Sequence, residues 1–283
     1  MRYHCKLLNA SFMKPFLLIS RLIFLASFCF QLSSCSSPVK EKNDSLYSRH
    51  LQRKVDLSIV TTPMPDDKSD MNLFILLSGA GNDQWNMKEI VDSLYEAKAI
   101  LPLLVVKVEG KSSEEFGLSE MTGQGLPGKK AVQFDKFINQ ELYTYIKKKT
   151  SVRKFSSITI AGAGKAGISA FDLAWHHDEK FNRVAIFSGA WHDWKRDPAD
   201  STAILDYLAQ TRKRPKLQYW FYAGEKADTV IAGLTRQVYT KLAAKSFINT
   251  ADMSVQFDQT GLNDQEAYNH QLAHCLIWAY GKK

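Results

Sequence analysis

The sequence predicts an α/β fold in which a mostly parallel sheet is covered by helices on both faces. Three observations support this prediction: apolar runs alternate with amphipathic stretches, most of the apolar runs are continuous, and glycine-containing turns separate them. Continuous apolar strands are typical of parallel sheets that are buried on both sides, because crossover helices cover each face.

The expected elements follow one another in a regular order after residue 54. The first strand, 55–61, alternates apolar and polar residues and is therefore expected at an edge of the sheet. We expect further strands at 72–77, 103–108, 157–161, 183–187, 217–222 and 253–257. Helices are expected at 87–98, 131–149, 202–210, 231–245 and 266–280, and one more helix follows the strand 157–161 and ends near Trp175. The glycine-containing segment 109–130 is expected to be a long functional loop.

The first 34 residues have the composition of an export signal. A basic start at Lys14 precedes an apolar stretch, and Leu32-Ser-Ser-Cys35 resembles the lipobox of bacterial lipoproteins. This pattern predicts cleavage before Cys35 and lipidation of its thiol. An ordinary cleaved signal or an anchor helix is the alternative. Met13 is a candidate for the true start, since the twelve residues before it are atypical of a signal.

The rest of the chain is expected in the bacterial cell envelope, held by its lipid at the outer membrane. Polar residues 35–53 are predicted to be a tether, and residues 54–283 a folded domain large enough for its own core. The signal carries four basic residues and no acidic one, so the net charge falls from +8 to +4 on cleavage. No nucleic-acid partner is expected, because no dense basic run is interleaved with aromatic residues. The expected partners are the membrane and a small molecule, a carbohydrate or a protein.

The stretch "SSITIAGAGKAGISA", residues 156–170, is predicted to be a strand, a glycine turn and the start of a helix. As G-x-G-x-x-G it suggests dinucleotide binding, but the acid expected at the end of the next strand is missing, since "SGAW" follows 183–187. The same strand–turn–helix carries the nucleophile elbow G-x-S-x-G in α/β-hydrolases, with Gly164 here in the serine position. The preferred interpretation is therefore an elbow without a cofactor, and dinucleotide binding stays an alternative.

From about residue 53 to residue 280 the chain resembles the putative-esterase family of α/β-hydrolases, which includes esterase D and enterochelin esterases. The resemblance depends on the order and spacing of the segments "NLFILLSGAGNDQW", "DSLYEAKAILPLLVVKVEG", "EEFG" with "GKKAVQFDKFINQEL", "ITIAGAGKAGISAFDLAW" and "FNRVAIFSGAW". It implies an α/β-hydrolase fold with a serine–histidine–acid triad.

The positions that the resemblance assigns to the triad hold other residues. Gly164 stands for the serine and Asn263 for the histidine. Ala227 occupies the position of the acid, and Asp228, one residue later, is the alternative acid. Glycine has no nucleophilic atom, and an amide cannot accept and return a proton near neutral pH. We therefore expect a degenerate triad and an inactive esterase with a binding or interaction role.

The resemblance also places the oxyanion-side turn at Gly79 and Ala80, opposite Lys165. An active carboxylic-ester hydrolase with non-standard residues remains an alternative, with Ser169 or Ser188 as nucleophile.

Trp191, His192 and Trp194 follow the carboxyl end of a strand, where such sheets bind ligands. These three residues are interpreted either as a ligand platform or as loop packing. His270 and His274 have the spacing of metal ligands on a helix, but no third ligand is evident and no metal is expected. Cys275 is expected to be a buried, inert thiol.

Overall fold

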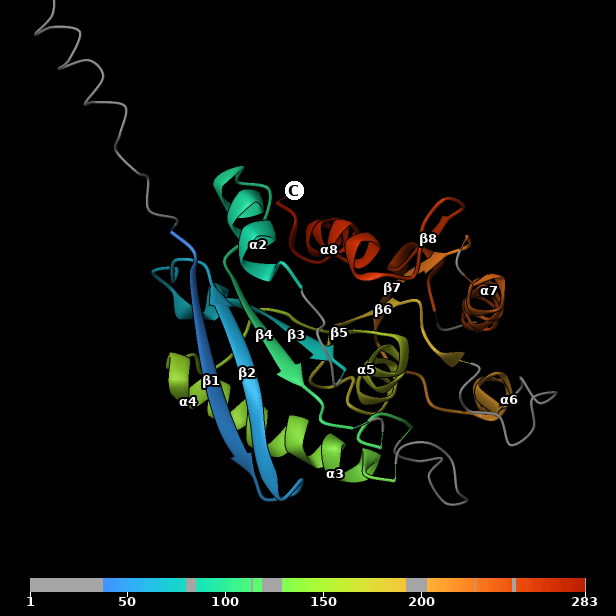
Figure 1. Ribbon diagram of the computed structural model, residues 1–283, viewed down its shortest axis with the longest axis horizontal. Helices are drawn as coiled ribbons and strands as arrows, with labels where there is room; N and C mark the ends of the chain where they lie inside the picture. The colour runs from blue at the N-terminus through green and yellow to red at the C-terminus, as the bar shows by residue number, and fades with distance from the viewer. Residues whose placement is uncertain are drawn as a thin grey trace, which may run out of the picture. The chain divides into compact units, whose positions relative to one another are not determined.

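A computed structural model describes residues 38–79, 85–112, 114–118, 129–191, 203–226, 228–245 and 248–282. These residues belong to one compact unit, Pro38–Lys283, built around an eight-stranded sheet of order β1-β2-β4-β3-β5-β6-β7-β8 (Figure 1). The strands are β1 (Lys40–Ser48), β2 (Arg53–Thr61), β3 (Asn72–Ser78), β4 (Leu103–Glu109), β5 (Ile158–Ala163), β6 (Arg183–Phe187), β7 (Gln218–Gly224) and β8 (Met253–Asp258). β1 and β2 pair antiparallel and β3 to β8 run parallel, which confirms the predicted mostly parallel sheet.

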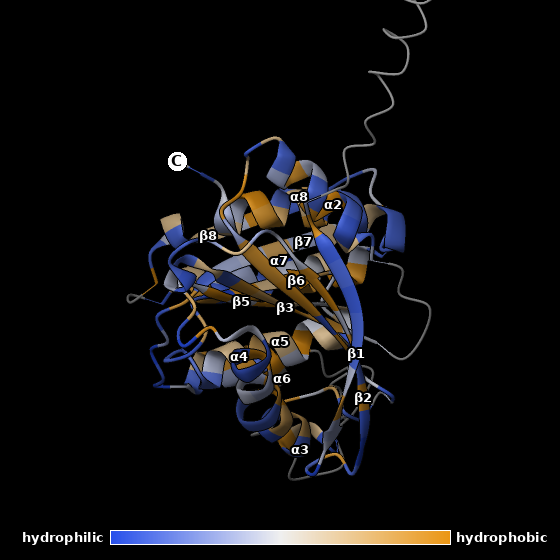
Figure 2. Ribbon diagram, turned by 90° about the vertical axis from the view of Figure 1, so that its left-hand side faces the viewer, coloured by the Kyte–Doolittle hydropathy of each residue, from blue (hydrophilic) through white to orange (hydrophobic). Residues whose placement is uncertain are grey.

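Helices cover both faces of this sheet. They are α2 (Met87–Glu96), α3 (Ala131–Lys136), η4 (Phe137–Leu142), α4 (Tyr143–Thr150), α5 (Gly164–His176), α6 (Ala203–Gln210), α7 (Thr229–Ala243) and α8 (Gln265–Tyr280), with short 3₁₀ turns at Lys68–Asp70 and Thr250–Asp252. α2 and α8 pack on one face, and α3, α5 and α6 pack on the other (Figure 2). The buried residues of α7 belong to the same core as those of α5 and α6. The helix predicted for 131–149 runs as α3, η4 and α4, with π-helical turns in η4. None of the described helices is long and apolar enough to cross a membrane.

Strand β3 shows how the apolar runs produce two cores. All seven of its residues are buried. Leu73, Ile75 and Leu77 belong to the core under α3 and α5, whereas Phe74 and Leu76 belong to the core under α2 and α8. Successive side chains of a strand point to opposite faces, so a strand covered on both sides has to be apolar throughout.

The first strand of the sheet lies in a segment that the sequence predicts to be a tether. The prediction for 35–53 is wrong for residues 40–48, because these residues form β1 and pair with β2 from Lys40↔Thr61 to Ser48↔Arg53. β2 is consequently not an edge strand, since β4 pairs on its other side. β1 is polar because it is an exposed edge, and Figure 2 shows it as a hydrophilic strand beside apolar neighbours. The predicted signal, Cys35 and residues 35–37 of the tether lie outside the described residues.

Side chains from the helical face hold this edge in place. Glu141 of η4 accepts hydrogen bonds from the Ser48 hydroxyl at 2.6 Å and from the Arg49 backbone N–H at 3.0 Å. Asp44 of β1 accepts hydrogen bonds from Tyr145 at 2.7 Å and forms an ion pair with Lys149 at 2.8 Å. The edge strand therefore docks on α4 as well as on β2.

Candidate functional site

A sharp turn joins β5 to α5 at Gly164, where the backbone φ is +54°. A Cβ added at Gly162 would lie 2.5 Å from the backbone carbon of Ala166, and one at Gly167 would lie 2.7 Å from the carbonyl oxygen of Gly162. Only glycine allows the strand and the helix to approach so closely. This strand–turn–helix geometry is that of a nucleophile elbow, in which the central residue is exposed and strained.

The central position of this elbow is sterically open. A Cβ added at Gly164 would meet no described atom within 4 Å, although the left-handed backbone conformation disfavours other residues. The space in which a serine hydroxyl would stand is thus present, but Gly164 has no side chain. The turn keeps the shape of an elbow and lacks the atom that attacks a substrate.

Asn263, at the predicted histidine position, connects the ends of two strands. Its Oδ1 accepts a hydrogen bond from the Ser188 hydroxyl at 2.5 Å and from the backbone N–H of Gly224 at 3.0 Å. Its Nδ2 is buried and has no hydrogen-bond partner among the described residues. The predicted position therefore does lie beside the carboxyl ends of β6 and β7, where its amide makes structural hydrogen bonds and has no acid–base function near neutral pH.

The alternative acid, Asp228, is the N-cap of α7. Its Oδ1 accepts hydrogen bonds from the backbone N–H groups of Val230 at 2.8 Å and Ile231 at 3.0 Å. N-cap carboxylates satisfy donors that the first turn of a helix leaves unpaired, so this side chain has a structural role. Ala227, at the expected position of the acid, lies outside the described residues.

Neither serine considered as an alternative nucleophile is accessible. Ser169 is 2 % exposed, and its Oγ accepts a hydrogen bond from the backbone N–H of Gly117 at 2.6 Å. Ser188 is 1 % exposed and has a φ of +47° at the end of β6. The sequence did not predict its bond to Asn263, because the two residues are far apart along the chain and only the sheet order brings them together.

The segment that follows β4 is anchored beside the elbow. Arg53 donates hydrogen bonds to both carboxylate oxygens of buried Glu115, at 2.7 and 2.6 Å. Gly117 is bound in turn to Ser169 of α5. The start of the predicted long loop, residues 110–118 without Ser113, is therefore clamped between β2 and α5. Residues 119–128 lie outside the described part of the chain.

Trp191 is a core residue, which corrects its place in the predicted ligand platform. Its ring is 2 % exposed, its Nε1 donates to the Thr235 hydroxyl at 3.1 Å, and it packs edge-on against Phe171. A buried indole with a satisfied N–H contributes to packing and offers no surface to a ligand. His192 and Trp194 lie outside the described residues.

The two sides of the expected oxyanion turn belong to neighbouring strands. Gly79 directly follows β3, and Lys165 lies in the first turn of α5, directly after β5 and the elbow. β3 and β5 are adjacent and parallel, so the two positions approach each other at the same edge of the sheet. Ala80, the other residue predicted for this turn, is outside the described residues.

An aromatic cluster beside the elbow was not predicted. Trp85, which precedes α2, stacks on Tyr268 of α8 with ring centroids 5.9 Å apart, and both rings contact Phe187 at the end of β6 edge-on. Contacts between such distant segments leave no periodic signal in the sequence. Trp85 and Phe187 belong to the buried core under α2 and α8, and Tyr268 is partly exposed at its border.

His270, His274 and Cys275 of α8 were considered for metal or thiol chemistry. The rings of His270 and His274 lie 4.9 Å apart in an edge-on arrangement. Within the described part of the chain, no group of three or more His, Cys, Asp or Glu side chains could hold a metal ion. Cys275 is buried and burial raises the pKa of its thiol, as expected of an inert cysteine.

The sheet order and the strand–turn–helix at Gly164 are those of an α/β-hydrolase fold. Gly164 and Asn263 are the residues that the resemblance assigns to the nucleophile and histidine positions. The chain belongs to the family described as "Putative esterase", whose sequence profile matches residues 48–279. This membership explains the glycine turn as an elbow, so the dinucleotide interpretation is no longer needed for it.

Solved structures of esterases share the fold. A ferulic acid esterase matches with a TM-score of 0.66 and 18% identity over 86% of this chain and 98% of that one. The enterobactin esterase from Shigella flexneri, with 2,3-dihydroxy-N-benzoyl-glycine present, matches with a TM-score of 0.67 and 20% identity over 84% of this chain and 59% of its own length. A feruloyl esterase module from Clostridium thermocellum matches with a TM-score of 0.61 and 13% identity over 87% of this chain and 89% of that one. No curated protein sequence matches the chain.

Proposed function

We propose that the protein is a catalytically inactive esterase that binds its ligand at the elbow and does not hydrolyse it. The observation that carries the proposal is Gly164 at the nucleophile position, in a turn that has kept the geometry of an elbow. The amide of Asn263 adds support, since it bonds to Ser188 and Gly224 in the place of a general base.

Each step of acyl transfer by a serine esterase needs one of the three side chains of the triad. A hydroxyl attacks the ester carbonyl, an imidazole takes its proton and returns it to the leaving group, and a carboxylate orients the imidazole. In a measured protease, losing the nucleophile alone lowers kcat about 10⁶-fold, roughly as much as losing the whole triad. With no hydroxyl at Gly164, no covalent acyl intermediate forms there.

The ligand that we propose is an aromatic acyl ester or a carbohydrate that carries one. Two of the solved structures of this fold are named for esterases of ferulic acid and enterobactin, and one of them was determined with a dihydroxybenzoyl compound. Within the aromatic cluster Trp85 and Phe187 are buried, and Tyr268 is partly exposed. The ring of Tyr268, backed by Trp85, is therefore the surface on which an aromatic ligand can pack.

Activity-based labelling of the wild-type protein tests the loss of catalysis. A fluorophosphonate probe and a panel of feruloyl and 2,3-dihydroxybenzoyl esters are expected to give no labelling and no hydrolysis, while the same esters bind by calorimetry. Ester hydrolysis that disappears in Ser188→Ala and persists in Ser169→Ala, or the reverse, would show a shifted nucleophile and overturn the proposal.

We further propose that the protein is an exported lipoprotein, anchored in the cell envelope through Cys35. The lipobox-like Leu32-Ser-Ser-Cys35 after an apolar stretch supports this. Cys35→Ala is expected to give an unprocessed or soluble form. Unchanged membrane retention and unchanged mass of the variant would contradict the anchor.

A further inference from the structure

A concave site lies at the edge of the sheet opposite the elbow. Its volume is about 870 Å³, and Asn72, Arg183 and Gln218, the first residues of β3, β6 and β7, line it. Trp278 and Lys282, at the end of α8, complete the wall. We call it the amino-edge cavity, because the amino ends of parallel strands meet there, whereas the elbow follows the carboxyl end of β5. Its size is that of ordinary small-molecule sites.

The charged side chains that line the amino-edge cavity, among the described residues, are all basic. Arg183, Lys216 and Lys282 line it, and none of the described residues that line it carries a carboxylate. Lys216 and Lys282 are exposed. Within the described part of the chain, neither ammonium group has an ion-pair partner. An oxyanion in this cavity would therefore meet uncompensated positive charge from three side chains.

The guanidinium group of Arg183 is held rigidly by neutral partners. Its Nε donates to Gln218 Oε1 at 2.7 Å, its Nη1 donates to the Ser157 hydroxyl at 2.5 Å, and its Cζ lies 5.9 Å from the ring centroid of Tyr280. Among the described residues no acid pairs with Arg183, and its Nη2 donates to none of them. The remaining N–H groups of this fixed guanidinium can therefore donate to an anion from outside the chain.

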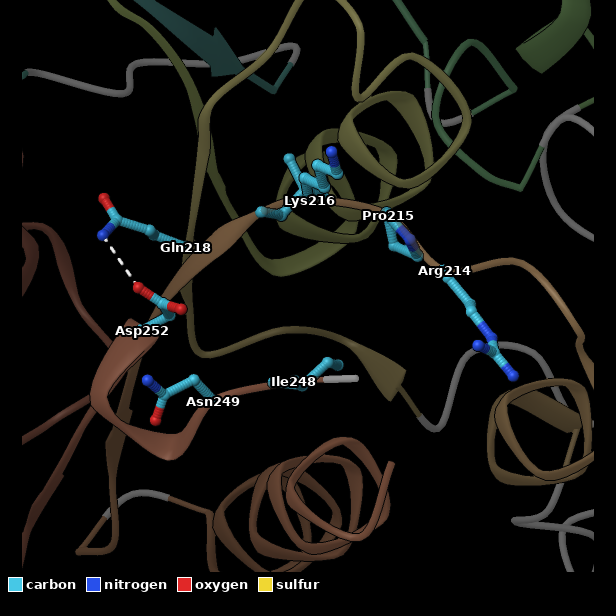
Figure 3. Close-up of a pocket in the computed structure, with 8 residues that line it drawn as sticks. Arg214, Pro215, Lys216, Gln218, Ile248, Asn249 and Asp252 are labelled. Carbon is cyan, nitrogen blue, oxygen red and sulfur yellow. Dashed lines mark hydrogen bonds between the residues drawn. The ribbon is translucent and has the colours of Figure 1, made fainter. Parts of the chain in front are cut away.

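The adjoining concavity explains how Gln218 is oriented (Figure 3). It measures about 460 Å³ and shares Lys216 and Gln218 with the amino-edge cavity. There the Nε2 of Gln218 donates to Asp252 at 3.1 Å, which turns Oε1 toward Arg183. A second carboxylate nearby, that of Asp178, accepts a hydrogen bond from the backbone N–H of Lys216 at 3.0 Å and forms an ion pair with Lys213 at 3.8 Å. Neither Asp252 nor Asp178 pairs with Arg183.

We propose that the amino-edge cavity binds an anionic saccharide, whose carboxylate or sulfate group interacts with Arg183, Lys216 and Lys282. A fixed guanidinium can donate two parallel hydrogen bonds to two oxygens of such a group, and the two exposed lysines add positive charge. The indole of Trp278 supplies apolar surface on which the C–H face of a sugar ring can pack. This site is separate from the elbow, so it would bind a sugar whether or not the elbow retains its own ligand.

Calorimetric titration of the full-length protein tests the site with three probes: digalacturonate, lactose carrying one sulfate, and lactose itself. Binding of at least one anionic probe in the millimolar range or tighter, with weaker binding of lactose, is the expected result. Lys216→Ala with Lys282→Ala should weaken it about tenfold and reduce its dependence on sodium chloride. Both lysines are exposed, so the double variant is expected to fold.

Two further variants separate the site from general charge effects. Lys226→Ala removes an exposed charge that follows the carboxyl end of β7, at the opposite edge of the sheet, and should leave the affinity unchanged. Arg183→Lys keeps the charge but loses the fork of donors, and is expected to weaken binding as well. Equal affinity for lactose, binding that the double variant does not alter, or no binding of either anionic probe would overturn the proposal. Binding of one anionic probe alone would identify carboxylate or sulfate as the recognised group.

Discussion

Two glycines of the elbow, only two residues apart, should respond very differently to the same added methyl group. At Gly164 the methyl meets open space, so the cost is that of a left-handed backbone conformation, about 1–2 kcal/mol. The smaller entropy of the unfolded chain offsets roughly 0.4–1 kcal/mol of this. Gly164→Ala should therefore lower the free energy of unfolding by only about 0.5–1 kcal/mol, or a few degrees in Tm.

At Gly162 the added Cβ would lie 2.5 and 2.6 Å from the backbone carbon and oxygen of Ala166, so α5 has to move away from β5. Because the obstacle is backbone at the centre of the molecule, Gly162→Ala should cost about 3 kcal/mol or more. Urea denaturation and calorimetry of the two variants beside the wild type measure the difference. Equal losses of stability, or a tolerated Gly162→Ala, would refute the elbow geometry described above.

Three other predictions concern substitutions that each remove the contacts of one side chain. Asn263→Ala leaves the Ser188 hydroxyl and the Gly224 N–H without their acceptor and should cost about 1–3 kcal/mol in urea denaturation; a loss near zero would show that the bridge is unimportant. Hydrogen bonds from Lys149 and Tyr145 lower the pKa of Asp44 from 3.8 to about 2, so this carboxylate stabilises the fold above pH 4 and loses that contribution as the pH falls toward 2. Above pH 4 the wild type should be more stable than Asp44→Asn by less than about 1 kcal/mol, because the ion pair is partly exposed. This difference should shrink as the pH falls toward 2, and a difference that stays constant would argue against the contact. Trp191→Ala should cost about 3–5 kcal/mol by calorimetry, as for a core aromatic residue, and a stable variant with altered ligand binding would restore the platform interpretation.

The amino-acid sequence was enough to predict the elements whose side chains are nearly all buried. β3 and β5 were predictable because strands buried on both faces must be apolar throughout. The elbow was predictable because its glycines are required by local backbone geometry, which acts between near neighbours in the chain. Gly164 and Asn263, the residues that the resemblance to the family places at the nucleophile and histidine positions, were also identified from the sequence.

Tertiary structure alone decided the features that depend on partners distant in the chain. β1 is polar like a tether, and it becomes a strand only because β2 offers its hydrogen-bonding edge and α4 binds Asp44. The bridge from Asn263 to Ser188 exists because the sheet order places β6 and β7 side by side. Trp191 is buried because α5 and α7 close over it, and the amino-edge cavity forms where four strands begin against the end of α8. In each case the energy comes from contacts whose partners no local pattern specifies.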